Sequence, residues 1–220
     1  MKEQIDLIRR DILKVKERTG VEATLVAVTK NRSTQMIREL RRYGVMDIGE
    51  NRVQELLEKV SEIPKDMRIH FIGHLQRNKV RQVVPIAHLI HSLDSIRLAY
   101  EIDKQAERVG KRQQVLVQIN LAREENKFGF YEEEIKEAMR ELEELVHLDV
   151  RGFMMMAPFE EEPAQLRALF SHAKLIFDYY RKTLYNNSRI SILSMGMSGD
   201  YREALESGSN MVRIGSRIFE

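Results

Sequence analysis

The stretch ATLVAVTKNRSTQMIRELRRYG, residues 23–44, joins a short apolar run to an amphipathic segment. Residues 24–29 are apolar or β-branched, which predicts a buried strand. In the segment that follows, Ile37, Leu40 and Tyr43 recur at the spacing of one helix face. The stretch therefore predicts one strand followed by one helix.

This strand–helix unit recurs along the chain of 220 residues. We count about eight such units, and strict alternation of strands and helices implies parallel strands with helical crossovers. The fold class predicted is α/β, a (β/α)8 TIM barrel with an extra N-terminal helix, which forms a single domain over residues 1–220. An open doubly wound sheet is the alternative, but it usually has a glycine-rich first turn, and the turn TKNRST contains no glycine.

The composition limits the classes of function. Hydrophobic residues make up 43% and charged residues 32%, which is typical of a soluble globular protein. With 36 basic and 34 acidic residues, the formal charge of +2 gives no basis for binding nucleic acid or an anionic membrane. No cysteine is present, which excludes disulfides and thiolate chemistry. No signal peptide or membrane span is evident, so we expect a cytoplasmic protein.

Lys30 ends the first predicted strand. In a parallel barrel the functional face lies at the carboxyl ends of the strands, so Lys30 is placed where sites are commonly built. A lysine amine there can form a Schiff base with a carbonyl compound. A surface lysine that merely closes the strand is the alternative.

The segment ILSMGMSGDYREALESGSNMVRIGSRIF, residues 192–219, contains the last two predicted strands and their exit loops. These loops are rich in serine and glycine, and a helix is predicted to begin near Asp200. In barrels such loops commonly form a phosphate site, because backbone N–H groups can approach an anion closely. Two ordinary Ser/Gly loops are the alternative.

Arg213 lies within the last apolar strand and needs a partner there, because a buried guanidinium keeps its charge. A planar acceptor in a pocket would suffice, and so would a carboxylate such as Glu50 or Asp47. A lysine, a phosphate cradle and an arginine at one barrel mouth suit a phosphorylated aldehyde, above all pyridoxal 5′-phosphate (PLP). A sugar-phosphate aldolase would use similar parts but needs further acid and base residues.

Seven motifs follow one another along nearly the whole chain: LVAVTKNRS, DIGENRVQE, IHFIGHLQRNK, VLVQINLAREENKFGF, RGFMMMAP, LSMGMSGD and GSNMVRIGSRIF. In this order they resemble the pyridoxal phosphate homeostasis proteins, the YggS/PROSC type, which are related to the N-terminal barrel of alanine racemase. His74 and Arg77 depart from the family pattern at the rim of the pocket.

The resemblance implies a role for particular residues. Lys30 would carry PLP as a Schiff base, and Arg213 would face the ring nitrogen. The remaining cofactor-binding residues implied are Asn51 beside the lysine, Ser194, Gly215 and Ser216 around the phosphate, and Met155, Met195 and Gly196 along the pocket wall.

The resemblance also implies a PLP-binding protein of intracellular PLP homeostasis, a carrier or buffer without efficient catalysis. An arginine opposite the ring nitrogen weakens the electron sink, and the second base of the related racemases comes from a C-terminal β domain outside these residues. A PLP-dependent racemase or related enzyme is the alternative, and a regulatory protein with a structural cofactor is a third. We expect a monomer, with apo PLP-dependent enzymes as recipients of the cofactor.

His70 and His91 lie in or beside apolar runs without the spacing of a metal site. They are predicted to be buried histidines whose ring nitrogens are hydrogen-bonded, and no metal site is expected.

Overall fold

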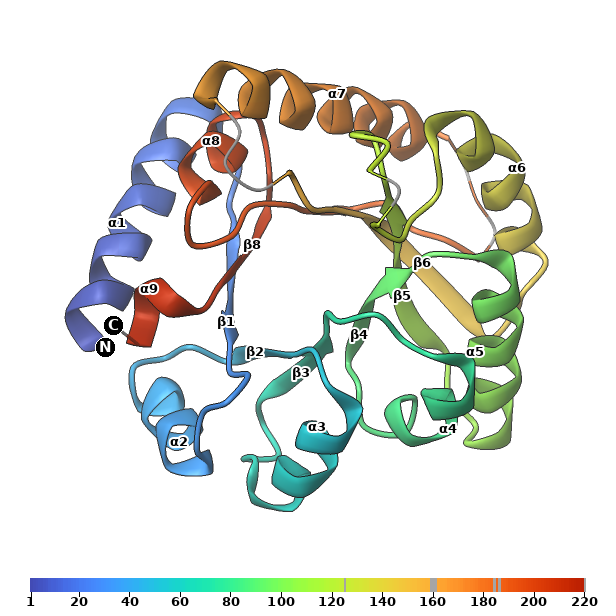
Figure 1. The fold of residues 1–220 in the computed structure, drawn as a ribbon, viewed down its shortest axis with the longest axis horizontal. Coiled ribbons are helices and arrows are strands. Elements are labelled where there is room, and N and C mark those ends of the chain that lie inside the picture. Colours follow the sequence, from blue (N-terminus) through green and yellow to red (C-terminus); the bar gives the residue numbers. More distant parts are fainter. Residues whose placement is uncertain (125, 159–161, 184, 186, 220) are drawn as a thin grey trace.

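The computed structural model describes residues 1–124, 126–158, 162–183, 185 and 187–219. Parallel strands follow one another around a closed barrel in sequence order, and the last strand pairs with the first (Figure 1). The strands are β1 (Thr24–Val28), β2 (Asp47–Glu50), β3 (Arg68–Phe71), β4 (Leu89–Leu93), β5 (Gln113–Ile119), β6 (Leu148–Met155), β7 (Ile192–Ser194) and β8 (Met211–Ile214). The predicted (β/α)8 barrel is confirmed.

Helices surround the barrel on the outside (Figure 1). They are α1 (Lys2–Thr19), α2 (Thr34–Arg42), α3 (Val53–Lys59), α4 (Val80–Val83), α5 (Ile96–Arg108), α6 (Glu132–Glu143), α7 (Pro163–Arg181), α8 (Tyr201–Glu206) and α9 (Ser216–Phe219), with short 3-10 turns η1 (Val60–Glu62) and η2 (Arg77–Lys79). Across the described part of the chain, no helix is both long enough and apolar enough to cross a bilayer.

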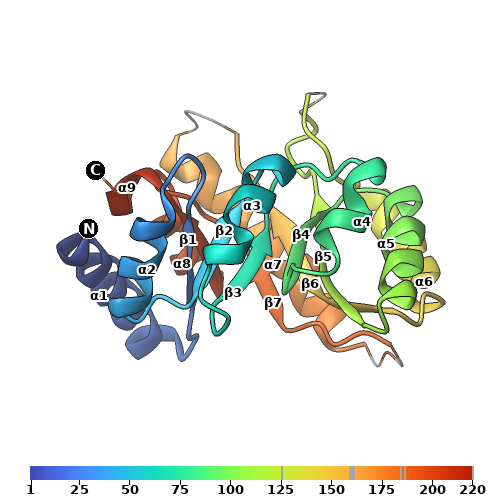
Figure 2. The same cartoon turned by 90° about the horizontal axis from the view of Figure 1, so that it is seen from below.

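The additional helix α1 contacts α8 and α9, so the first and last helices of the chain lie side by side. Figure 2 shows α1, α2 and α9 at one end of the molecule and α5 and α6 at the other. Tyr201 of α8 donates a hydrogen bond of 2.7 Å to Asp11 of α1. The N-terminal helix therefore supports the segments that follow β7 and β8.

Local signals set the helix ends. The hydroxyl of Ser33 caps α2 by accepting a hydrogen bond from the Met36 N–H at 3.4 Å. Gly20 ends α1 with φ 73°, a left-handed conformation that glycine adopts without strain, and its N–H bonds the carbonyl of Lys16. A serine thus begins α2 and a glycine ends α1, on the two sides of the first strand.

Two apolar clusters divide the core. The interior cluster fills the barrel and consists of Val26, Leu89, Leu116, Met154 and Met211. The outer cluster lies between the strands and the helices and contains the neighbours of these residues along each strand, such as Ala27, Ile90, Val115, Met155 and Val212. Successive side chains of a strand point to opposite faces, so adjacent residues fall into different clusters.

The strand register sets which residues meet at the open end. Val26 of β1 pairs with Asp47 of β2 on one side and with Arg213 of β8 on the other. The carboxyl ends of β2, β1 and β8 therefore lie at one edge of the barrel, where parallel barrels build their sites.

Candidate functional site

Lys30 lies two residues beyond the end of β1, and its side chain is exposed. Val26 and Val28 mark the side of β1 that faces the barrel interior. Val26 belongs to the interior cluster, and the Val28 Cβ lies 3.3 Å from where a Cβ on Gly215 would be. Lys30 itself lies in the turn beyond the carboxyl end of β1, so its exposed side chain is at the functional end of the barrel.

The residue before Lys30 is held by a buried network. The Thr29 hydroxyl donates a hydrogen bond of 2.6 Å to Glu50. Lys59 of α3 donates to the Thr29 carbonyl at 2.9 Å and to Glu50 at 3.1 Å. Burial raises the pKa of Glu50, although the bonds from Thr29 and Lys59 oppose this. The backbone entering Lys30 is therefore fixed by groups from β2 and α3.

The residue after Lys30 is held by the same helix. Asn31 has φ 57°, a left-handed conformation that few non-glycine residues adopt. Its N–H donates a hydrogen bond to Glu55 of α3, which also pairs with Lys59 at 2.5 Å. Lys30 thus sits in a turn whose two flanking residues are both anchored to α3.

Asn51 follows β2, and the register of β1 and β2 places it level with Lys30. Its Oδ1 is buried and has no hydrogen-bond partner among the described residues. Buried polar atoms are almost always paired, so the lack of a donor to this oxygen is consistent with a ligand site. Gly73 makes room here, because a Cβ on it would lie 2.1 Å from the Asn51 carbonyl oxygen.

The loops after β7 and β8 lie against each other. The Ser198 hydroxyl accepts a hydrogen bond of 3.2 Å from the Gly215 N–H, and the Gly196 carbonyl accepts one of 3.0 Å from the Arg213 N–H. Gly196 has φ +96°, and a Cβ there would meet the Ala204 Cβ at 2.6 Å. These two loops, with Ser198 and Gly215 in contact, form what we call the loop cradle, and their small residues suit close approach of an anion.

Arg213 is 3% exposed. It donates from Nη1 to the Ser194 hydroxyl at 2.7 Å and from Nη2 to the Met155 carbonyl at 2.9 Å. Its partners are therefore a hydroxyl and a carbonyl, and neither Glu50 nor Asp47. Burial lowers the pKa of Arg213 to about 10, against the opposing charge of Asp200. The guanidinium is charged at neutral pH.

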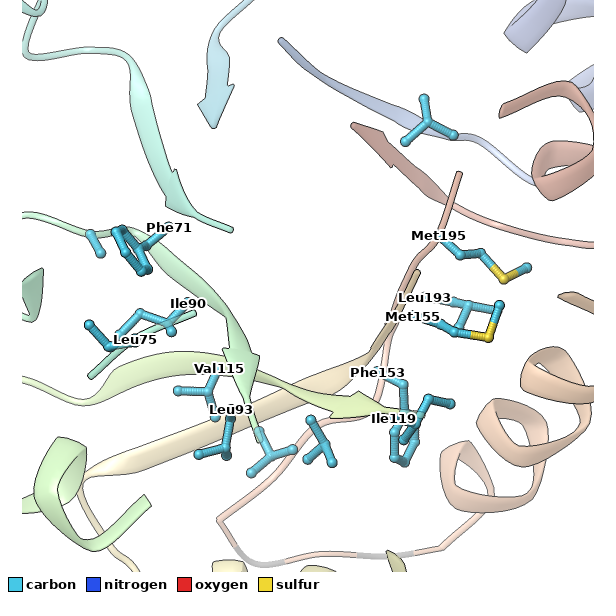
Figure 3. Packing of buried hydrophobic residues seen from close by; sticks show 14 of the residues in the cluster. Phe71, Leu75, Ile90, Leu93, Val115, Ile119, Phe153, Met155, Leu193 and Met195 are labelled. Carbon is cyan, nitrogen blue, oxygen red and sulfur yellow. The ribbon is translucent and has the colours of Figure 1, made fainter. Parts of the chain in front are cut away.

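The structure places three of the residues named from the sequence away from the loop cradle. The Ser194 hydroxyl is fully buried and bonds Arg213 and His91 inside the barrel, so it is not part of the loop cradle. The side chains of Met155 and Met195 belong to the outer cluster together with Leu193 (Figure 3). Met155 follows the interior residue Met154 and therefore faces outward, because a single position along a strand decides which face a side chain occupies. Ser194 faces the interior together with Arg213.

Neighbouring residues supply the loop hydroxyl and the methionines that face the barrel interior. Ser198, and not Ser194, supplies a hydroxyl to the loop cradle. Met154 is in the interior cluster and Met156 packs against it. Alternation within GFMMMA could have identified them, because Phe153 and Met155 share the other face.

His70 and His91 are buried and hydrogen-bonded, as predicted. The sequence did not show that their rings bond each other at 2.8 Å, nor that His91 reaches Ser194 at 3.1 Å. Both histidines lie on the barrel-facing side of their strands. At the rim, His74 stacks on Phe128 with ring centroids 3.6 Å apart and bonds Asp94 at 2.9 Å.

Comparison with known proteins identifies the family. The alanine racemase N-terminal domain family matches residues 4–220. The pyridoxal phosphate homeostasis protein of Synechocystis is 38% identical over 199 residues, 89% of each chain. The protein of the same name from Aquifex aeolicus is 37% identical over 221 residues, 99% of this chain and 96% of its own. This chain belongs to the pyridoxal phosphate homeostasis protein family.

Solved structures agree with membership of this family. PipY of Synechococcus elongatus, determined without PLP, superposes with a TM-score of 0.91 at 31% identity and covers both chains completely. The structure of PipY with PLP bound gives a TM-score of 0.88 at 30% identity, over 100% of this chain and 99% of that one.

In this member of the pyridoxal phosphate homeostasis protein family, three chemical capacities lie on, or directly after, consecutively paired strands of the barrel. An exposed amine can attack a carbonyl, glycine- and serine-containing loops can hold an anion, and a buried arginine can bond a planar acceptor. They come from β1, from the loops after β7 and β8, and from β8 itself.

Proposed function

We propose that this chain binds PLP at the carboxyl end of its barrel and takes part in PLP homeostasis as a cofactor carrier or buffer. The observation that carries the proposal is that Lys30, the loop cradle and Arg213 lie on, or directly after, the consecutively paired strands β1, β8 and β7. The PLP-bound structure of PipY and the printed names of the relatives support it.

The residues present fit this cofactor. Ser198, Gly215 and Ser216 would hold the phosphate, Arg213 would face the ring nitrogen, and the unpartnered Oδ1 of Asn51 would accept a hydrogen bond from the ligand or its water. When bound, the cofactor supplies an aldehyde carbon that an amine can attack with loss of one water. Lys30 supplies that amine.

The carrier role follows from Arg213. Its guanidinium keeps its proton at neutral pH, so the ring nitrogen opposite it stays unprotonated and is a weak electron sink. We therefore expect negligible exchange of amino-acid α-hydrogens with D2O. Sustained exchange or racemisation would favour a PLP-dependent racemase or related enzyme instead.

The binding site is tested by absorption of the purified protein with added PLP, before and after borohydride. Wild-type protein should be yellow, and reduction followed by peptide mapping should place the cofactor on Lys30. Lys30→Ala should abolish this fixation, whereas Lys65→Ala, at an exposed lysine away from the barrel mouth, should not. A wild-type protein that stays colourless in excess PLP would contradict the proposal.

Delivery is tested with an apo PLP-dependent enzyme. Loaded wild-type protein should restore its activity, and protein reduced with borohydride should not, because its cofactor can no longer leave. We expect the donor to be a monomer, which size-exclusion chromatography with light scattering would check.

A further inference from the structure

A continuous chain of polar side chains crosses the barrel interior. The His70 Nε2 lies 2.9 Å from Asp47, the His70 Nδ1 lies 2.8 Å from the His91 Nε2, and the His91 Nδ1 lies 3.1 Å from the Ser194 hydroxyl. Arg213 completes the chain at 2.7 Å from that hydroxyl. All these residues are at most 5% exposed, and they come from β2, β3, β4, β7 and β8.

The direction of each hydrogen bond among these side chains can be derived by starting from Arg213. Arg213 can only donate, so the Ser194 oxygen accepts. The Ser194 proton then needs an acceptor, and the His91 Nδ1 is its other partner in the described part of the structure. Because His91 accepts at Nδ1, its ring proton is on Nε2 and points to His70.

The same reasoning fixes the second ring. His70 accepts from His91 at Nδ1, so its own proton is on Nε2 and is donated to Asp47. Every hydrogen bond in the chain then points from the arginine to the aspartate. The reverse order would leave the Ser194 proton without an acceptor among the described residues.

The charges at the two ends agree with this direction. Burial alone would raise the pKa of Asp47, but hydrogen bonds from His70 and Arg68 lower it to about 2, so the residue is an anion. Burial, together with the nearby His70 and Arg213, lowers the pKa of His91 well below its usual value. A neutral His91 thus lies between a fixed cation and a fixed anion.

We propose that His91, supported by His70 and Asp47, is a positioning residue for Arg213. By accepting a hydrogen bond from the Ser194 hydroxyl, His91 turns its proton away from Arg213, so that a lone pair of the serine oxygen faces the guanidinium and holds it in place. The ligand side of this inference rests on the proposed PLP function, because the consequence is that Arg213 is held toward the cofactor ring. The hydrogen-bond direction does not depend on PLP.

The direction is tested first, on ligand-free protein labelled with 15N at histidine. The ring nitrogens of His70 and His91, assigned with His70→Gln and His91→Asn, should report neutral rings that carry their proton on Nε2. A charged ring, or a proton on Nδ1 of either, would overturn the inference whatever happens with PLP.

Positioning is tested with two variants of matched size. His91→Asn keeps an acceptor facing Ser194, so its Kd for PLP should stay within about twofold of the wild-type value. The absorption maximum of bound PLP should not shift. His91→Leu removes the acceptor, and its PLP affinity should fall about tenfold with a shifted maximum. Borohydride should still fix PLP to Lys30 in both.

Ser194→Ala breaks the same link with a smaller change, which covers the case in which His91→Leu folds poorly. Its effect should match that of His91→Leu, and the double variant should be no worse than either single one, because both act through one path. Equal behaviour of wild type, His91→Leu and His91→Asn would overturn the inference, and so would additive losses. A wild-type protein that does not bind PLP would refute the proposed function. The 15N result would still show whether the hydrogen bonds run from Arg213 to Asp47.

Discussion

The ammonium of Lys59 donates a hydrogen bond of 2.9 Å to the backbone carbonyl of Thr29, the residue before Lys30. The same ammonium pairs with Glu50, whose side chain is fully buried. A lysine of α3 therefore fixes the backbone that leads into Lys30.

Lys59→Met should destabilise the protein by about 3 kcal/mol, because it leaves the carboxyl of Glu50 buried without its cation. Urea unfolding measures the change. Lys174→Met is the matched control, since its partner Asp178 is 38% exposed, and it should cost less than about 0.5 kcal/mol. Adding Glu50→Gln to Lys59→Met should recover much of the loss, and a double variant no more stable than the single one would contradict the pairing.

Acid should weaken the fold partly through Asp47. Its pKa is lowered from 3.8 to about 2 in the folded protein, so the stabilisation is complete above the unfolded value and is lost as the pH falls from about 4 to about 2. The loss should be about 2 kcal/mol. Unfolding free energies across this range should show a shallower acid slope for Asp47→Asn, and an unchanged slope would contradict the assignment.

Gly196→Ala should destabilise the loop after β7, because φ +96° is strained for alanine and its Cβ would lie 2.6 Å from the Ala204 Cβ. We expect a loss of about 1–3 kcal/mol, measured by thermal or urea unfolding, with weaker PLP binding. Gly199→Ala in the same loop is the control, because no heavy atom lies within 4 Å of its added Cβ. Equal stability of the two variants would count against this loop geometry.

Ser198→Ala should weaken PLP binding about tenfold, because it removes the loop hydroxyl next to the Gly215 N–H. Fluorescence titration with PLP gives the Kd, and competition by inorganic phosphate should weaken in parallel. The spectrum of bound PLP should stay unshifted, in contrast to His91→Leu, because Ser198 does not contact Arg213 in the described hydrogen-bond network. An unchanged Kd would assign phosphate binding to the backbone alone.

The fold could be predicted because alternating strands and helices leave few arrangements in which every apolar face is buried. Lys30, Asn51 and Gly215 could be placed for a related reason, since each follows or ends a strand and parallel strands share one functional edge.

Side-chain facing and long-range pairing could not be predicted from the motifs alone. Met155 points away from the interior that Met154 faces, because the face changes with every residue. The bond between His91 and Ser194 joins residues 103 positions apart, and no periodicity within a strand reports a partner on another strand. Barrel closure, which is a property of the whole chain, brings them together.

Side chains fill the barrel below Arg213, from the polar chain to the interior cluster. A molecule bound above them enters and leaves by the same doorway at the carboxyl ends of the strands. Association and dissociation of a ligand then use the same opening. A macromolecule bound over that rim would slow both to the same degree, unless it accepts the ligand itself.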